Sequence, residues 1–293
     1  MMNTNLMYKF NFMRFRRQAL GLSALLVLLS LGLLLTRGLN LGIDFTGGNL
    51  LQLEFPAPVQ VSEVRGVLGH LGQSKAVIQA YSDRGVIVRL QAEEEGVRKD
   101  VLNALKAKFN GLSVLRFEKV GPVVGEQLRR EACVALLVAL LGILIYITIR
   151  FQFRFAVVSV VALLHDTIIT LGLFSLMGRE ISITFIAAIL TIVGYSLNDT
   201  IVVLDRVREN WKHLRGWGVD GLMNVSINQT LSRTINTSLT TFLPVLAFYI
   251  WGGPVLANFS FALMTGIVIG TYSSIYIAGA LLDEWFTGVP VSK

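Results

Sequence analysis

The chain has 293 residues, of which 53% are hydrophobic and only 15% are charged. Soluble domains average about 25% charged residues, so this composition and a mean hydropathy of +0.63 exclude an ordinary soluble protein. The net charge of +7 would suggest nucleic-acid binding in a soluble protein, but membrane proteins concentrate Lys and Arg in their cytoplasmic loops. The composition predicts an integral membrane protein with no nucleic-acid partner.

Six apolar runs are long enough to cross a bilayer, which takes roughly 20 residues. The first run follows a cluster of arginines, as the core of a signal peptide would, but no small-residue cleavage site comes after it. We therefore interpret it as an uncleaved span. The predicted order is a cytoplasmic segment 1–18, a span 19–37, an outer domain 38–130, spans 131–150, 155–177 and 182–204, a cytoplasmic loop 205–230, spans 231–251 and 255–282, and a cytoplasmic tail 283–293.

The positive charges predict the orientation of the spans. One set of flanking segments carries Lys9, Arg14, Arg16, Arg17, Arg150, Arg154, Arg206, Arg208, Lys212 and Arg215. The short loops on the other side carry only Arg179, with Glu180 beside it. Because positive charges stay in the cytoplasm, both termini are predicted to be cytoplasmic and residues 38–130 to lie outside.

The outer segment has the patterns of a mixed α/β domain. Strands are predicted at 49–55, 76–81, 86–90 and 114–117, and helices at 61–71 and 93–109. The order β-α-β-β-α-β is the split βαβ pattern. The single cysteine, Cys133, excludes an internal disulfide and is interpreted as a small buried residue at the start of an apolar run.

The third predicted span carries His165 and Asp166 well inside the apolar run. A central Asp costs about 2.5–3.5 kcal/mol on insertion scales, so it needs a hydrogen-bond partner, a proton or water. Thr170, four residues later, shares a helix face with Asp166. Asp166 is therefore a candidate for a proton pathway, and a structural hydrogen bond that fixes helix packing is the alternative.

The fourth predicted span ends in a polar block around Asp199. Tyr195 lies four residues earlier on the same helix face, and Asn198 adds an amide. Gly194 and Ser196 are small enough to permit close helix approach. Ionisable residues inside spans often mark proton relays, so Asp199 is the strongest relay candidate; a purely structural ion pair is the alternative.

The fifth predicted span begins with a polar stripe. Arg233, Thr237 and Thr241 recur every four residues and so lie on one helix face. Arg233 enters from the same side as Asp199, so it could pair with Asp199 or Asp166. A carboxylate that is ionised when paired and protonated when separated would couple proton passage to movement. The alternative is that Arg233 snorkels to the interface.

The motifs of known intramembrane or nucleotide-driven enzymes are absent from the sequence. No H-E-x-x-H, G-x-S-x-G or P-loop pattern occurs. The sequence therefore predicts a protein that is not an enzyme, with no cofactor and no metal. Its work would come from an ion gradient or from a partner.

Five motifs together resemble the SecD/SecF family of the bacterial protein-export machinery, and in particular its smaller SecF branch. They are G-I-D-F-T-G-G at 42–48, V-G-P-V-V-G at 120–125, His165-Asp166, G-Y-S-L-N-D-T at 194–200 and R-T-I-N-T-S at 233–238. The first contains Gly42, Asp44, Gly47 and Gly48, and the second contains Gly121, Pro122 and Gly125. The resemblance covers nearly the whole chain.

The resemblance implies an RND-superfamily fold: a polytopic α-helical membrane protein of six spans with an α+β ferredoxin-like periplasmic domain. It implies one half of a pseudo-symmetric unit in the bacterial cytoplasmic (inner) membrane, completed by SecD. The implied role is to use the proton-motive force to help exported preprotein chains emerge after the SecA-driven SecYEG channel has admitted them. YajC and YidC are further partners that it suggests.

The resemblance also assigns residues. Asp199 and Arg233 fall where the family has its proton-pathway Asp and Arg, and Asp166 fits a third polar position. Supporting polar residues are Tyr195, Asn198, Thr237 and His165. The glycine motifs that flank the outer domain could be hinges or rigid turns. The rival readings are half of an RND-type small-molecule exporter, a purely structural membrane subunit and an intramembrane enzyme.

Overall fold

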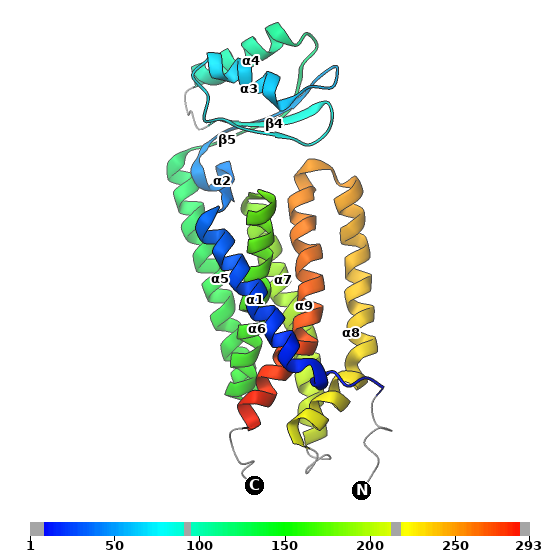
Figure 1. The fold of residues 1–293 in the computed structure, drawn as a ribbon. Helices are drawn as coiled ribbons and strands as arrows, with labels where there is room; N and C mark the ends of the chain where they lie inside the picture. The colour runs from blue at the N-terminus through cyan, green and yellow to red at the C-terminus, as the bar shows by residue number, and fades with distance from the viewer. Residues whose placement is uncertain (1–8, 91–94, 212–217, 288–293) are drawn as a thin grey trace. The chain divides into compact units, whose positions relative to one another are not determined.

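The computed structural model describes residues 9–90, 95–211 and 218–287 (Figure 1). Contacts divide the chain into two compact units. A helical unit holds Met1–Asn40 and Ala135–Lys293, and an α/β unit holds Leu41–Val134. Lys212 and Arg215, which contribute to the predicted charge asymmetry, and the start of the helix predicted at 93–109 lie outside the described residues.

The helical unit is built from long helices that match the six predicted apolar runs, with one residue of 19–37 and one of 182–204 outside the helices. They are α1 (Arg16–Thr36), α5 (Pro122–Arg150), α6 (Phe153–Met177), α7 (Ile183–Trp211), α8 (Gly218–Trp251) and α9 (Gly253–Thr287). A short 3₁₀ helix η2 (Met13–Phe15) precedes α1, and the short strands β1 (Asn40–Leu41) and β6 (Glu180–Ile181) follow α1 and α6. Helices α7 and α8 extend into the predicted loop 205–230, where Val207 of α7 and Leu222 and Met223 of α8 pack in one apolar cluster.

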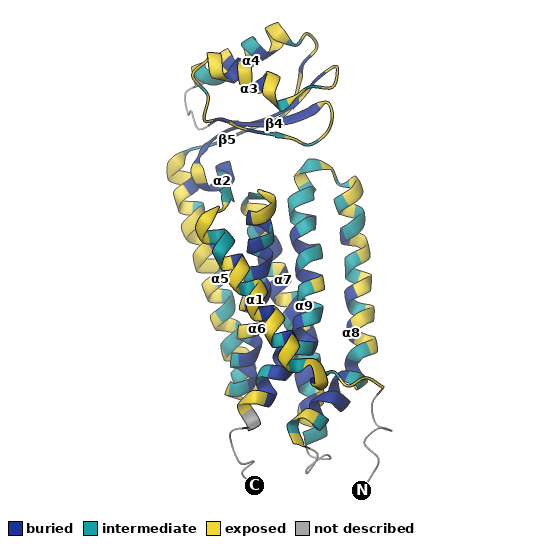
Figure 2. Ribbon diagram, viewed as in Figure 1, coloured by how far each residue is buried: buried dark blue, intermediate teal, exposed yellow. Residues whose placement is uncertain are grey.

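Five of these helices are long and apolar enough to cross a membrane: α1, α5, α6, α7 and α9. Only 11% of the apolar stretch of α5 is buried, against 56% of that of α6. The difference is visible in Figure 2, where α5 is largely exposed. Exposed apolar helix surface of this extent needs lipid or another protein around it, so the chain is an integral membrane protein.

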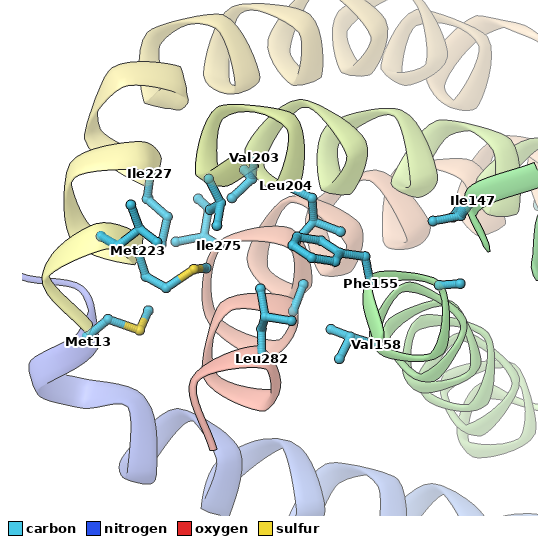
Figure 3. Packing of buried hydrophobic residues seen from close by; sticks show 14 residues of the cluster. Met13, Ile147, Phe155, Val158, Val203, Leu204, Met223, Ile227, Ile275 and Leu282 are labelled. Atoms are coloured by element: carbon cyan, nitrogen blue, oxygen red, sulfur yellow. The ribbon is translucent and has the colours of Figure 1, made fainter. Parts of the chain in front are cut away.

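One apolar cluster joins the helices at the end of the bundle that holds Met13 (Figure 3). Phe155 of α6, Leu204 of α7, Met223 of α8 and Leu282 of α9 all belong to it. Each of these side chains is at most 5% exposed. The same end, which we call the basic end, holds Arg14, Arg16, Arg17, Arg150, Arg154, Arg206 and Arg208.

A buried ion pair also closes the basic end. Arg16, at the start of α1, places Nη1 2.6 Å from Asp283 Oδ2, near the end of α9, and 3.3 Å from Asp220 in the first turn of α8. The Asp283 side chain is fully buried. A buried carboxylate is costly unless it is paired, so Arg16 fixes the ends of three helices relative to one another.

The segment before η2 is held by two amides of α8. Asn228 accepts hydrogen bonds from the backbone N–H groups of Lys9 and Phe10 and donates one to the Phe10 carbonyl. Asn224 accepts from the Met13 N–H in the same way. These contacts satisfy backbone groups that the segment cannot satisfy within itself.

The α/β unit contains a four-stranded antiparallel sheet and two main helices. Its elements run β2 (Gly48–Glu54), α3 (Val61–His70), β3 (Val77–Ala80), β4 (Gly85–Leu90), α4 (Glu95–Lys108) and β5 (Ser113–Val120). The strand order across the sheet is β3-β4-β2-β5. Leu51 pairs in register with Val88 and Phe117, while a bulge between Gln52 and Leu53 shifts the rest of the β2–β5 pairing.

The core of the α/β unit lies between the sheet and its helices. Leu51 and Leu53 of β2, Val88 of β4, Leu68 of α3 and Leu105 of α4 are completely buried in one cluster. The alternating pattern of β2 places Leu51 and Leu53 on the same face of the sheet. This common core explains why α3 and α4 cover that face.

The two glycine motifs contact each other inside the α/β unit. The stretch after Gly42 forms a short helix α2 (Ile43–Thr46), which ends at Gly47 with a φ of 72°. A Cβ on Gly47 would lie 3.0 Å from the backbone of Pro122, and one on Gly125 would lie 3.1 Å from the Gly47 nitrogen. Glycine is required at both positions because backbone meets backbone there.

One sequence interpretation is wrong in this region. Cys133 was expected to be a small buried residue, but its side chain is exposed. The reason is that α5 presents most of its apolar residues outward.

Candidate functional site

Asp166 lies in the middle of the helical unit and takes hydrogen bonds from two other helices. Ser196 of α7 donates to Asp166 Oδ2 at 2.6 Å, and Ser273 of α9 donates to the same oxygen at 2.8 Å. All three side chains are completely buried. Both O–H···O distances are short, so Asp166 fastens α6 to α7 and α9.

His165 is the third side-chain partner of the Asp166 carboxylate. Its Nδ1 lies 2.9 Å from Asp166 Oδ1, on the adjacent residue of α6. The other ring nitrogen, Nε2, is buried and has no hydrogen-bond partner among the described residues. Thr170 shares the helix face of Asp166 as predicted, and its hydroxyl donates to the Asp166 backbone carbonyl.

Asp199 of α7 is the second buried carboxylate, and its side chain is held more loosely. Thr237 and Ser238 of α8 donate to its two oxygens at 3.4 and 3.3 Å. Ser238 is also 2.7 Å from the Thr271 hydroxyl of α9. The Thr237 hydroxyl can donate instead to backbone carbonyls of its own helix, so at least one bond to Asp199 is easily exchanged.

Two glycines of α9 explain how α7 and α9 approach closely enough for this arrangement. A Cβ on Gly266 would overlap the Ile192 side chain, and one on Gly270 would lie 3.0 Å from Ser196 Cβ. Small residues spaced four apart let membrane helices approach closely. Ser196, which was expected to permit close helix approach, lies against Gly270, whereas Gly194 is exposed and has no neighbour in this chain within 4 Å.

Arg233 lies on α8 near Asp199 but forms no ion pair with Asp199 or Asp166 within the described part of the chain. Its side chain is exposed. It lines a cavity of about 370 Å³ together with Asn198, Ile201, Val202, Asp205, Arg206, Glu209, Gln229 and Thr230. Charged and amide side chains dominate this lining, so the cavity suits water rather than lipid.

The remaining predicted residues divide between the two carboxylates and the cavity. Tyr195 has a buried hydroxyl without a hydrogen-bond partner in the described residues. Asn198 is exposed and lines the cavity with Arg233. Buried polar groups are usually paired with protein or with ordered water, so Tyr195 Oη and His165 Nε2 mark positions where water or a second conformation supplies the partner.

Two buried carboxylates, Asp166 and Asp199, lie between the helices. Hydroxyl groups of α7, α8 and α9 hold them by hydrogen bonds. Hydroxyls can both donate and accept hydrogen bonds, so they can pass a proton or reorient when a carboxylate changes its charge. Across the described ranges, no group of three or more His, Cys, Asp or Glu side chains could hold a metal ion.

Sequence reasoning missed the serines and the outer arginine. Ser273 and Thr271 of α9 are inconspicuous in an apolar run, although a small polar residue deep in a span is itself a signal. Arg179, next to β6, donates to Asn258 at 3.1 Å and to the Tyr249 hydroxyl at 2.8 Å. Its guanidinium also lies 4.1 Å from the centre of the Phe261 ring.

The sequence also matches known proteins along most of its length. The family model described as "Protein export membrane protein SecD/SecF, C-terminal" matches residues 100–287, and the "SecD/SecF GG Motif" model matches residues 32–59. The chain belongs to the SecD/SecF family. The glycine motif at Gly47 and the membrane helices that carry both buried carboxylates therefore fall within family-defining segments.

Individual relatives agree. "Protein translocase subunit SecF" of Desulfurispirillum indicum is 45% identical over 289 residues, which cover 95% of this chain and 92% of the relative. The protein of that name from Pseudomonas aeruginosa is 44% identical, covering 93% and 90%.

A longer relative and its crystal structure extend the comparison. "Protein translocase subunit SecDF" of Thermus thermophilus is 45% identical over 94% of this chain, which spans 38% of that longer protein. The crystal structure of the Thermus SecDF, described as a translocon-associated membrane protein, matches with a TM-score of 0.89 and 46% identity over 95% of this chain and 39% of that one. A second structure, in the super-membrane-facing form, matches with a TM-score of 0.73.

Proposed function

We propose that this chain is an accessory subunit of the Sec preprotein translocase that couples proton movement to a late step of protein export. The observation that carries the proposal is the pair of buried carboxylates, Asp166 and Asp199, each held by hydroxyl groups of neighbouring helices. Ionisable side chains at such positions mark proton pathways in membrane transporters. The family membership supplies the protein-export setting. The chain would not be an enzyme.

Within this proposal the two carboxylates have different tasks. Asp199 takes only long hydrogen bonds of 3.3 and 3.4 Å, and its sequence neighbour Asn198 lines the polar cavity with Arg233. It is therefore the group that exchanges protons with water. Asp166, with shorter bonds of 2.6 and 2.8 Å, is the third residue of the proposed pathway, beside Asp199 and Arg233. Its protonation would loosen the contact between α6, α7 and α9.

Arg233 completes the proposed cycle as a fixed positive charge. A guanidinium does not lose its proton in proteins, so it favours the ionised form of any carboxylate that approaches it. In the present conformation Arg233 faces the cavity instead of Asp199. A rotation of α8 that brings the two together would expel the proton, which links helix movement to proton release.

The proposed topology has six spans, with α8 as the fifth in chain order. At 34 residues it is about 50 Å long, and its polar stripe explains its lower hydropathy. The basic end would face the cytoplasm of a bacterial inner membrane, with both termini there and residues 38–130 in the periplasm. The strand order β3-β4-β2-β5 and the two helices on one face support a ferredoxin-like periplasmic domain.

A polar face on α7 and α8 supports a membrane partner. Thr191 and Asn198 of α7 and Asn236 and Thr240 of α8 are exposed in the isolated chain. Polar groups that face lipid are unfavourable, so another protein should cover this face. The Thermus relative, whose printed name is SecDF, has a chain more than twice as long as the matching part. We therefore place SecD on this face, and we place SecYEG, SecA, YajC and YidC in the same assembly.

The proposal is tested by the release of an exported precursor from cells that carry Asp199→Asn. Asn keeps the shape of the side chain but cannot bind and release a proton. The matched control is Asp100→Asn on the exposed face of α4. At equal membrane levels, Asp199→Asn should lose the gradient-dependent part of export, and Asp100→Asn should keep it.

Full gradient-dependent export in Asp199→Asn would instead indicate a purely structural subunit. Normal protein export together with loss of resistance to small toxic compounds would indicate half of a small-molecule exporter.

A further inference from the structure

Two arginines at the basic end converge on one aromatic ring. Arg150, the last residue of α5, and Arg208, in the last turn of α7, each place their guanidinium carbon 5.6 Å from the centre of the Phe151 ring. Arg208 Nη1 also reaches the Arg150 backbone carbonyl at 3.5 Å. The ring face and the carbonyl end of α5 offset part of the positive charge of the two guanidinium groups. Because the two groups still repel each other, an anion beside them would be stabilising.

The described carboxylates do not supply that negative group. Within residues 9–90, 95–211 and 218–287, no carboxylate oxygen lies within ion-pair distance of Arg150 or Arg208. Glu209, the residue after Arg208, pairs with Arg206 at 2.8 Å. The positive charge at Phe151 is therefore left available to a ligand.

The start of α6 adds to the positive field beside the two arginines. Helix α6 begins at Phe153, immediately after the Phe151 turn, with no side-chain cap and no acidic residue in its first turn. Arg154 lies in that first turn. A helix N-terminus carries partial positive charge, and arginine forks bind phosphate oxygens well. The arginines and the helix start favour the same kind of anion.

Exposed apolar side chains lie directly beside this charge. Ile149 is 80% exposed, Ile145 is 59% exposed and Phe153 is 58% exposed. Ile145 and Ile149 are four residues apart and so form one strip of α5 that ends at Arg150. A ligand that suits both features has an anionic phosphate and a hydrocarbon chain.

We propose that the Arg150–Phe151–Arg208 site binds the phosphate headgroup of an acidic phospholipid, with an acyl chain along Ile145 and Ile149. The lipid would neutralise the two guanidinium groups and fasten the end of the lightly packed α5 to α7. The site is independent of the two buried carboxylates, so the lipid is structural or regulatory and takes no part in proton transfer.

The test is lipid retention by the full chain, co-purified with its SecD partner from nanodiscs of equal parts phosphatidylglycerol and phosphatidylcholine, measured by native mass spectrometry. The wild type should retain phosphatidylglycerol in preference to phosphatidylcholine. Arg150→Gln/Arg208→Gln should lower that retention roughly tenfold, because each interfacial arginine contributes to anionic-lipid binding. Arg14→Gln/Arg17→Gln removes the same charge from exposed positions at the same end and should leave retention unchanged.

Two further experiments test whether the Gln variants lose lipid through misfolding and whether free phosphate can replace the lipid headgroup. Arg150→Lys/Arg208→Lys keeps the charge and should retain the lipid, which shows that the helices still assemble. Inorganic phosphate added to discs of phosphatidylcholine alone should not protect the protein against heating. The proposal is overturned if phosphate alone protects, if the wild type shows no preference, if both Gln pairs lose lipid equally, or if SecD cross-links to position 150.

Discussion

Asp199 of α7 and Arg233 of α8 lie on neighbouring helices near the basic end without forming an ion pair. The carboxylate is 2% exposed and accepts hydrogen bonds from Thr237 and Ser238, whereas Arg233 is exposed and lines the polar cavity. Hydroxyl groups therefore take the place of a positive partner at Asp199 in this conformation. Our proposal brings Arg233 to Asp199 only at the step that releases the proton.

The hydrogen bond between Ser273 and Asp166 should be important for stability. Ser273→Ala removes a buried donor at 2.8 Å and should lower the free energy of unfolding by about 1–3 kcal/mol. Ser274→Ala is the matched control, because Ser274 is equally buried but donates to a carbonyl of its own helix. Thermal unfolding in detergent measures both, and equal losses would contradict a special role for Ser273.

The contact between the glycine motifs should tolerate alanine at Gly121 but not at Gly125. Gly125→Ala would put a Cβ within 3.3 Å of the Gly47 and Phe45 backbones, whereas Gly121→Ala meets nothing within 4 Å. Overpacking of this kind costs about 1–3 kcal/mol. Limited proteolysis of the α/β unit should be faster only in Gly125→Ala. Unchanged proteolysis would favour a mobile hinge over a rigid turn.

Arg179 should stabilise the end of the bundle opposite the basic end. Arg179→Lys loses the planar group that reaches both Asn258 and Tyr249 and lies over Phe261. Lys cannot reproduce this geometry, so the free energy of unfolding should fall by about 1–2 kcal/mol. Arg37→Lys is the control, because it affects a single bond to the Leu176 carbonyl. Its melting temperature should fall less than that of Arg179→Lys. Equal melting temperatures of the two variants would contradict the assignment.

The polar face of α7 and α8 should contact SecD in the membrane. A photo-crosslinking residue in place of Thr240, on that face, should give a SecD adduct. The same residue in place of Leu28, which is 67% exposed on α1, should give little or none. Immunoblotting of irradiated membranes detects the adduct, and the reverse labelling pattern would place the partner on another face.

Apolar run length and strand alternation were sufficient to predict the main elements. The run at 131–150 falls inside α5, the run at 19–37 exceeds α1 by one residue, and the strand expected at 49–55 is β2 at Gly48–Glu54. Such patterns are local, so one sequence contains them. Helix ends were less predictable, because α5 begins at Pro122 and α7 continues to Trp211, beyond what bilayer length requires.

The partners of the carboxylates could not be predicted from local patterns. Ser273 reaches Asp166 from 107 residues away, and only the packing of α9 through Gly270 brings it there. The expected pairing of Arg233 with a carboxylate depends on the rotation of α8 about its own axis, which helical spacing leaves undetermined. The structure has Ser238 and Thr237 facing Asp199 instead.

Proton flux through the reconstituted complex tests the central claim most directly. Proteoliposomes that contain this chain with SecD, and a pH-sensitive dye inside, would be given an imposed pH gradient in sodium-free buffer. The account predicts flux in the wild type and in Asp100→Asn, and a loss of at least roughly tenfold in Asp199→Asn, whose amide cannot take up or release a proton in the physiological range. Equal flux in Asp199→Asn and the wild type, or flux that appears only when sodium is added, would contradict it.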